Sequence, residues 1–257
     1  MGSAGAPSAE TLVLVPIGIG TAYARLGEVQ SCYLVRAPGV AVAVDLGAGA
    51  MNRLQDRIAP EALDALVITH LHPDHCADLL ALRVYMAWGP GRGHRLRVIG
   101  PPGLRDALVA FSGPEGWDAF DFETLANEGG VLQLGAGLTM RHAQVPHLDP
   151  THAVRLEHGG RALCFSADCA ENGALPRLAE GVDLLLCECS FGAEAVAKGV
   201  PHLNAGQAGR MAARASADRL LLTHCYPEFD RDAALAAARE KFGGPVSWAR
   251  QAEDVAV

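Results

Sequence analysis

One hexapeptide constrains the fold of this chain more than any other feature. Residues 70–75 read His-Leu-His-Pro-Asp-His and directly follow the apolar run 67–69. Neutral imidazole nitrogen and carboxylate oxygen are the donors that borderline divalent metals prefer. A strand end followed by a turn can direct several such side chains at one point, which consecutive positions inside a helix cannot do. The hexapeptide therefore predicts a strand over residues 67–69 that ends at a metal site. An exposed His-rich turn without a ligand would leave the clustered imidazoles unexplained.

Three other ligand-type residues also follow apolar segments that we predict to be strands: His147, Asp168 and His224. A single histidine after a strand is more often an ordinary core or surface residue. Together with the hexapeptide, however, these three residues predict one site that is assembled at one edge of a sheet sandwich.

The remaining sequence alternates between strand-like and helix-like segments. Short apolar or alternating runs bounded by Gly and Pro predict strands at residues 11–15, 31–36, 40–45, 96–99, 131–134, 138–144, 152–157, 163–166, 183–187 and 219–223. Apolar residues at helical spacing predict helices at residues 61–66, 76–88, 101–111, 205–215 and 230–241. Strands dominate each half and helices follow them, which favours an α/β fold with two sheets face to face and helices outside.

The chain contains no low-complexity linker that would mark a domain boundary. We therefore expect residues 11–257 to form one domain built from two similar halves, and we treat residues 1–10 as a flexible N-terminus. The apolar stretch 12–19 is interrupted by Pro16 and Gly18 and is too short to span a bilayer, and we see no targeting segment. These features predict a protein that does not interact with membranes.

Composition narrows the choice of partners. The formal charge is −8, from 21 Lys and Arg against 29 Asp and Glu, which is a poor fit to a protein that grips long nucleic acid through its phosphates. A small phosphorylated substrate stays compatible, because a bound metal can supply local positive charge. The seven cysteines are an odd number without a CxxC pair, so we expect reduced thiols and a cytoplasmic location.

The hexapeptide resembles the HxHxDH motif of the metallo-β-lactamase superfamily. Residues 44–49, Val-Asp-Leu-Gly-Ala-Gly, look like the buried strand and turn of that superfamily. Residues 166–169, Ser-Ala-Asp-Cys, are similar to its SGD element, with Ala in place of Gly. The resemblance covers nearly the whole chain, and it implies a four-layer αββα metallo-β-lactamase sandwich with the metals at one edge.

Within the superfamily, the chain is similar to the RNase Z-like branch, which includes tRNA 3′-end endonucleases and phosphodiesterases. Residues 187–191, Cys-Glu-Cys-Ser-Phe, resemble the HEATF strand of that branch, and residues 202–205, His-Leu-Asn-Ala, resemble its HLTA element. Asp78 and the segment 241–246 look like the small actinobacterial enzymes described as atypical class II cyclic-nucleotide phosphodiesterases.

The resemblance implies a ligand set for two divalent metal ions. The donors fall into two groups with one shared member: His70, His72 and His147 for one ion, Asp74, His75 and His224 for the other, and Asp168 between them. Seven donors are more than one tetrahedral ion can use. Zn²⁺ is the first expectation, and Mn or Fe also accept this ligand set.

The resemblance also implies that Asp74, Glu188 and His202 act in catalysis. Glu188 lies on an apolar segment between two cysteines, where a carboxylate is costly to bury unless it is paired. His202 could satisfy this carboxylate, and the pair could then donate a proton to a leaving oxygen. A buried structural pair without a catalytic role is the alternative.

Several cysteines and histidines lie close to these motifs. Cys76, Cys169 and Cys225 each directly follow a proposed ligand, so one of them could itself be a ligand or a redox switch. Neighbouring side chains point elsewhere, however, and small buried cysteines are common. We expect His152 near the site, where it could meet substrate, and His142 at the surface.

These features predict a hydrolase that depends on two divalent metals. The first expectation is a phosphodiesterase that uses a metal-bound hydroxide on a small substrate such as a cyclic nucleotide. The alternative is a lactonase, thioesterase or arylsulfatase-like enzyme of the same fold, because a fold does not choose the reaction. A tRNA 3′-end endonuclease is less well supported, since RNase Z enzymes usually carry a long Gly/Pro-rich arm and residues 170–201 have no room for one. A non-catalytic metal-binding protein is the last alternative.

The expected partner is a small phosphodiester or ester, without long nucleic acid, and the chain is compatible with a homodimer.

Overall fold

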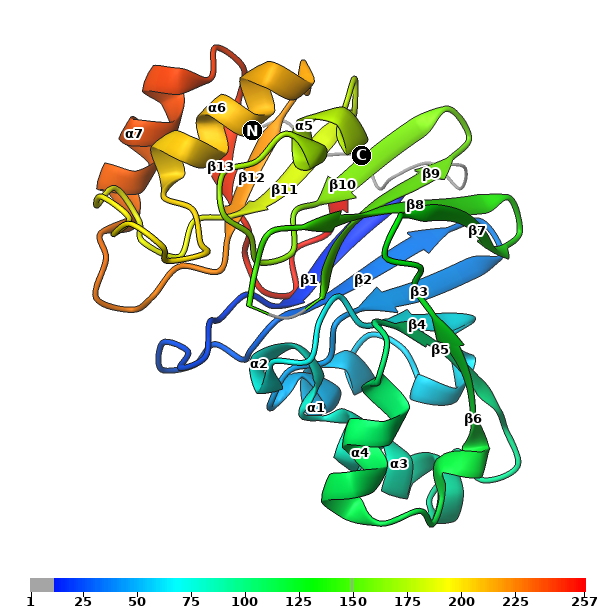
Figure 1. Ribbon diagram of the computed structural model, residues 1–257. Coiled ribbons are helices and arrows are strands. Elements are labelled where there is room, and N and C mark those ends of the chain that lie inside the picture. Colours follow the sequence, from blue (N-terminus) through cyan, green and yellow to red (C-terminus); the bar gives the residue numbers. More distant parts are fainter. Residues whose placement is uncertain (1–11, 149) are drawn as a thin grey trace, which may run out of the picture.

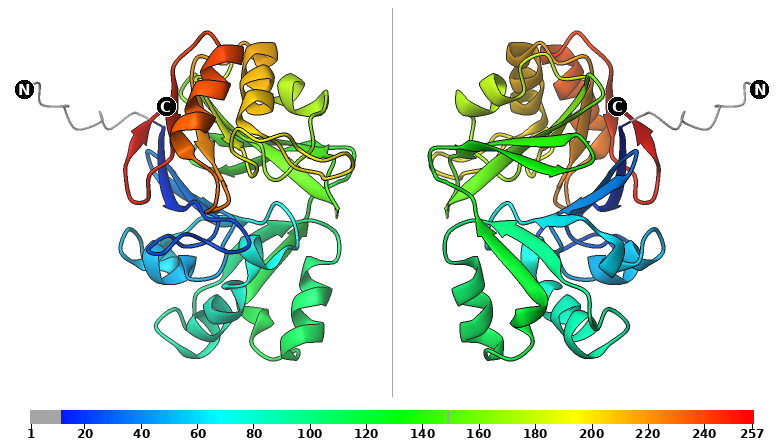
Figure 2. Two further views of the ribbon diagram at one scale, coloured as in Figure 1. Left: turned by 90° about the vertical axis from the view of Figure 1, so that its left-hand side faces the viewer. Right: turned by 90° about the vertical axis from the view of Figure 1, so that its right-hand side faces the viewer.

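The computed structural model describes residues 12–148 and 150–257. Two sheets of seven strands pack face to face, and helices cover the outer face of each sheet (Figures 1 and 2). This is the four-layer αββα arrangement that the sequence predicts. The segment 1–10, predicted to be flexible, lies outside the described residues.

The first sheet has the strand order β14-β1-β2-β3-β4-β5-β6. Its strands are β1 (Val13–Gly18), β2 (Cys32–Ala37), β3 (Val40–Val44), β4 (Ala65–Val67), β5 (Leu96–Gly100), β6 (Phe120–Thr124) and β14 (Val255–Ala256). The helices that follow its strands are α1 (Ala50–Gln55), α2 (Pro73–Cys76), α3 (Leu79–Trp88) and α4 (Leu104–Ser112). The strands from β3 to β6 are mutually parallel, so their carboxyl ends lie at one edge of the sheet.

The second sheet has the order β13-β12-β11-β10-β9-β8-β7. Its strands are β7 (Gly130–Gly135), β8 (Leu138–Val145), β9 (Thr151–His158), β10 (Arg161–Phe165), β11 (Leu184–Glu188), β12 (Leu220–Thr223) and β13 (Val246–Trp248). Its helices are α5 (Ala174–Leu178), α6 (Ala205–Ala215) and α7 (Arg231–Lys241). The strands from β10 to β13 are parallel, so this sheet also gathers four carboxyl ends at one edge.

Three apolar layers hold the sandwich together. The central layer lies between the sheets, where the rings of Tyr33 on β2 and Phe165 on β10 have centroids 4.8 Å apart. Two further clusters join each sheet to its own helices. Strand β11 therefore has no exposed side, which explains its unbroken apolar run: Leu186 faces the central layer and Leu185 faces the helices.

The structure corrects two of the predicted helices. Residues 61–66 are not a helix: a single 3₁₀ turn, Pro60–Ala62, is followed at once by β4. Parallel pairing of β4 with both β3 and β5 outweighs the local helical pattern. The predicted helix 76–88 starts later than expected: α3 begins at Leu79, and Cys76 is the last residue of the separate short helix α2. The backbone N–H of Asp78, between the two helices, donates to Leu46 O at 3.0 Å instead of continuing α2. None of the described helices is long and apolar enough to cross a membrane.

Candidate metal centre

The proposed ligands follow strands of both sheets at their common edge. His70 follows β4 in the first sheet, and Asp168 and His224 follow β10 and β12 in the second. Because carboxyl ends of parallel strands meet at the same edge, loops from distant parts of the chain converge there. The packing of the two sheets brings the two sets of loops together.

Sharp turns after β3, β10 and β12 direct side chains into the site. Asp45, Ala167 and His224 all have left-handed backbone conformations, with φ of 60°, 51° and 51°. For residues other than glycine such a conformation costs ~1 kcal/mol or more. Long-range backbone bonds hold two of these turns: Asp45 N–H donates to Val67 O at 2.7 Å and His224 N–H to Ile19 O at 3.1 Å. Ala167 occupies the position at which the similar SGD element has glycine.

The first group of donors converges as the sequence predicts. One ligand atom from each of four residues lies within 4.8 Å of all the others: His70, His72, His147 and Asp168. The Nε2 atom of His147 and the Nδ1 atom of His72 are 3.2 Å apart, although 75 residues separate them in the chain. The other nitrogen of His147, Nδ1, donates to Pro201 O at 3.0 Å, which leaves Nε2 to face the donors.

The second group shares Asp168 with the first. Its members, which again lie within 4.8 Å of one another, are Asp74, His75, Asp168 and His224. The Nε2 atom of His75 is 3.4 Å from Asp168 Oδ2, and the Nε2 atom of His224 is 3.3 Å from Asp74 Oδ2. All seven predicted ligands therefore lie in two adjoining groups, with Asp168 at their junction.

The donors fit a bound cation. His70 Nε2, His75 Nε2 and Asp168 Oδ1 are buried without a hydrogen-bond partner among the described residues, which is costly for polar atoms that have no ligand. Burial lowers the pKa of His70 well below its ordinary value, so this imidazole is neutral. Burial also acts to raise the pKa of Asp168, but the charges of His224 and His75 hold it well below the usual range. A neutral imidazole at His70 and an ionised carboxylate at Asp168 are the states in which these groups bind divalent metals.

Two residues without a predicted role, Asp45 and Thr69, orient the ligands. His75 Nδ1 donates to the fully buried Asp45 carboxylate at 2.7 Å, so that Nε2 points toward Asp168. The same carboxylate accepts from the backbone N–H of Thr69 at 2.8 Å and from its hydroxyl. The sequence did carry a signal for Asp45, because a carboxylate at the end of an apolar strand needs a partner.

Glu188 and His202 also pair beside the metal ligands. The Nδ1 atom of His202 is 3.1 Å from Glu188 Oε1 and 4.0 Å from Asp168 Oδ2. Burial alone would lower the pKa of His202, but the hydrogen bond and charge of Glu188 outweigh it and raise this pKa to about 9. The imidazole is therefore protonated at neutral pH.

Ser190 links this pair to the metal ligands and was missed at the sequence level. Its buried hydroxyl lies 2.7 Å from Glu188 Oε2, 3.2 Å from His202 Nδ1 and 3.0 Å from His224 Nδ1. A hydroxyl can donate to the carboxylate and accept from an imidazole. Serine is too common after a strand for the sequence alone to have indicated this role.

Two histidines lie elsewhere than predicted. His152 does not face the ligands: it is completely buried, its Nε2 donates to Ala126 O at 3.3 Å, and burial lowers its pKa to about 4. His142, predicted at the surface, is buried against it, with ring centroids 5.2 Å apart. They lie on β8 and β9, where the strand alternation puts His142 on the same face as Met140 and His152 on the same face as Val154, toward the layer between the sheets.

Cys76, Cys169 and Cys225 are absent from every donor group found in residues 12–148 and 150–257. Two of the thiols point at backbone instead: Cys76 Sγ lies 3.5 Å from Leu71 O and Cys225 Sγ 3.6 Å from Tyr226 O. Cys169 contributes its backbone N–H, which donates to Glu188 Oε1 at 2.9 Å.

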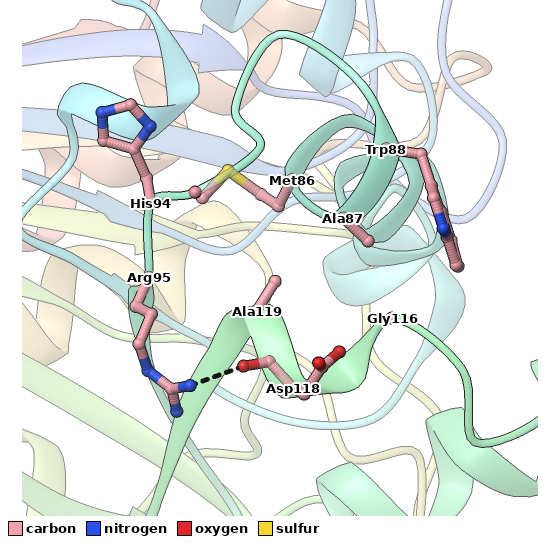
Figure 3. Close-up of a pocket in the computed structure, with 9 residues that line it drawn as sticks. Met86, Ala87, Trp88, His94, Arg95, Gly116, Asp118 and Ala119 are labelled. Atoms are coloured by element: carbon pink, nitrogen blue, oxygen red, sulfur yellow. Dashed lines mark hydrogen bonds between the residues drawn. The ribbon is translucent and has the colours of Figure 1, made fainter.

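A cavity of about 400 Å³ lies away from these ligands, between the end of α3 and the start of β6 (Figure 3). Arg95 donates to Asp118 O at 2.7 Å across this cavity, and Trp88 lines the opposite side. The guanidinium of Arg95 also pairs with the carboxylate of Asp121. Its charge is thereby compensated, and no member of the donor groups lines the cavity.

Comparison with known proteins agrees with this geometry. The family model described as "Beta-lactamase superfamily domain" matches residues 41–225. The uncharacterized protein Rv1339 of Mycobacterium tuberculosis is 35% identical over 225 residues, which cover 84% of this chain and 81% of that protein. A ribonuclease Z of Mycobacterium sp. (strain KMS) is 30% identical over 220 residues, 76% of this chain and 77% of that protein. The crystal structure of the metallo-β-lactamase fold protein YhfI from Bacillus subtilis superposes with a TM-score of 0.87 at 24% identity, covering 96% of this chain and 100% of that one.

Proposed function

This chain belongs to the metallo-β-lactamase superfamily and is a metal-dependent hydrolase, and from that premise we propose that it hydrolyses a small phosphodiester such as a cyclic nucleotide. The observation that carries the proposal is the Glu188–His202 pair: His202 Nδ1 bonds Glu188 and lies 4.0 Å from Asp168, which leaves Nε2 as the nitrogen that can donate to a substrate. A phosphodiester with an alkoxide leaving group needs a proton donor at that place. Similarity to a ribonuclease, an enzyme that cleaves the phosphodiester backbone of RNA, supports the same chemistry.

We propose that the two donor groups hold two divalent ions, Zn²⁺ first, with Asp168 between them. The shared carboxylate and the count of seven donors support two ions rather than one. Such ions, when bound, polarise phosphoryl oxygens and lower the pKa of a nearby water. Asp74, which faces His224 and His75, remains available to accept a proton or a hydrogen bond from the attacking water.

His202 is suited to protonate the leaving oxygen. Its side chain is 16% exposed, whereas that of Glu188 is fully buried, so the imidazole faces the substrate side and the carboxylate lies behind it. Glu188 also accepts from the backbone N–H groups of Cys169 and Ser190, at 2.9 and 3.0 Å. These bonds fix the carboxylate, which in turn keeps His202 charged and oriented until the proton is transferred.

A small substrate fits this chain better than tRNA does. Residues 170–201 contain only α5, β11 and the loop before α6 in the described structure, without a projecting arm. The formal charge of −8 also disfavours a long polyanion. A cavity of about 570 Å³ is lined by His147, Leu148 and Asn172 but by none of the other six proposed ligands; its size is typical of sites for small molecules.

A panel of substrates tests the proposal. The protein, loaded separately with Zn²⁺ and Mn²⁺, would be assayed on bis-p-nitrophenyl phosphate, 2′,3′- and 3′,5′-cyclic nucleotides, a lactone, a thioester and precursor tRNA. We expect turnover of at least one small phosphodiester at a rate well above that of the carbon esters. Faster cleavage of the lactone or thioester would replace the proposal with an esterase function. Cleavage of precursor tRNA at a comparable rate would favour the second candidate, a tRNA 3′-end endonuclease, which the ribonuclease Z relative supports.

A further inference from the structure

A second cavity lies at the β13 edge of the second sheet. It has a volume of about 570 Å³ and is lined by β12, α7, β13 and the chain that leads into β14 (elements in Figure 1). The lining runs along these strands: Arg219 precedes β12, whereas Trp248 pairs with Leu222 near the carboxyl end of β12. None of the seven proposed metal ligands lines this cavity, so it is distinct from the metal centre.

Three arginines, Arg219, Arg239 and Arg250, line this cavity. None of them forms an ion pair within the described part of the chain. Arg219 donates to Ala256 O at 2.6 Å and Arg239 to Val246 O at 3.1 Å. A neutral carbonyl oxygen compensates no charge, and each guanidinium has five donors, so most of them remain available.

The acidic residues of the lining do not cancel this charge. Asp254 is held by Arg36 and Arg57 outside the cavity, which leaves Glu253 against three guanidiniums. The cavity therefore carries an excess of positive charge in a chain whose formal charge is −8. The cavity between α3 and β6 differs in this respect, because its Arg95 is paired with Asp121.

Trp248 provides an aromatic surface in the same cavity. Its Nε1 donates to Arg231 O at 3.0 Å, and the guanidinium of Arg231 lies 5.2 Å from the ring centroid. These contacts hold the indole in place with Arg231 over one of its faces, so a planar group can stack on the other face at little cost in conformational entropy. Leu221 and Leu235 supply the apolar part of the lining.

We propose that this cavity binds a small anion that carries a planar ring, of the nucleoside monophosphate class. Guanidinium groups pair with phosphate oxygens through two parallel hydrogen bonds, which gives both affinity and orientation. The indole of Trp248 stacks with the base, and the volume suits a ligand of this size. The site is independent of the reaction at the metal centre and does not rest on the proposed substrate.

Calorimetric titration of the metal-loaded protein with AMP, adenosine and inorganic phosphate tests this proposal. We expect AMP to bind more tightly than either fragment, and to bind more weakly as salt rises. The double variant R239Q/R250Q should weaken AMP binding by about tenfold or more, since two charge-assisted bonds are lost. The double variant R53Q/R92Q removes two arginines elsewhere and should bind AMP as the parent does.

A further variant separates this site from the metal centre, which could itself bind a nucleotide. Asp168→Ala disrupts the metal centre alone, so binding of AMP should survive in it. Loss of binding in Asp168→Ala with retention in R239Q/R250Q would place AMP at the metals and overturn the proposal. Equal losses in the two arginine pairs, or no heat of binding at millimolar AMP, would overturn it as well. If inorganic phosphate bound as tightly as AMP, the ring would add nothing to binding, and the proposed stacking on Trp248 would be wrong.

Discussion

His75 donates a hydrogen bond of 2.7 Å from its Nδ1 atom to the carboxylate of Asp45, and both side chains are fully buried. The bond joins the turn after β3 to the helix α2 that carries the hexapeptide's last histidine. Burial opposes the charged form of His75, but the charges of Asp168 and Asp45 raise its pKa well above the ordinary value. Asp45 therefore makes the imidazole a more basic and better-oriented ligand.

Asp45→Asn is expected to weaken metal binding by about 10–100-fold, the range typical when the partner of a ligating histidine is removed. The measurement is metal retained against a competing chelator, read by elemental analysis. Asp121→Asn, which removes an exposed carboxylate paired with Arg95, is the matched control. Unchanged retention in Asp45→Asn would show that His75 is oriented without its partner.

Asp168→Ala is expected to lose both metal ions, because this carboxylate belongs to every donor group. Protein purified without chelator should contain close to two transition-metal ions per chain, and the variant close to none. Circular dichroism would show whether the variant is still folded. Full metal content together with full activity in Asp168→Ala would refute the ligand assignment.

His202→Ala should slow hydrolysis of a cyclic nucleotide or an alkyl phosphodiester far more than that of bis-p-nitrophenyl phosphate. A poor leaving group needs the proton that His202 supplies, an effect of roughly 10²–10⁴-fold, whereas p-nitrophenolate leaves without it. Metal content should stay unchanged. Equal losses on both substrates would mean that His202 only positions the substrate, and loss of metal would mean that it is a ligand.

Activity on a poor leaving group should fall as pH rises through about 9, the pKa of His202. This pKa is raised above the ordinary 6.5, so the stabilising contribution of the charged pair with Glu188 is fully present below pH 6.5 and is lost between there and about pH 9. Rate and melting temperature would be followed against pH for the parent and for His202→Ala. The alkaline decline of both quantities should shrink in the variant; an unchanged decline would assign it to another group.

Gly47→Ala should displace the segment that carries the proposed ligands Asp74 and His75. A Cβ atom at this position would lie 2.0 Å from the backbone oxygen of Asp74, so the loop that carries the ligands must move. We expect a loss of about 1–3 kcal/mol of stability, as for an overpacked core, and weaker metal retention, measured by denaturant unfolding and elemental analysis. Gly243→Ala, where nothing lies within 4 Å of an added Cβ, should change neither quantity.

The sequence by itself indicated the seven donors that converge in the structure and the positions of most strands. The prediction of residues 205–215 as a helix matches α6 at both ends, because its signals are local: Asn204 and Gln207 form a capping box within one turn. The hexapeptide is informative for the same reason, because four of the seven proposed metal ligands lie within its six consecutive residues.

Tertiary structure decided what depends on neighbours far along the chain. Strand β4 includes the last residues of a predicted helix because it pairs with strands on both sides. His152 is buried because the alternation of β9 points it into the layer between the sheets. Ser190 can bond both Glu188 and His224 because β11 and β12 end side by side in the second sheet. A local sequence pattern reports the preference of one segment for a helix or a strand. Contacts between distant segments depend on how the two sheets pack, which no single segment of the sequence specifies.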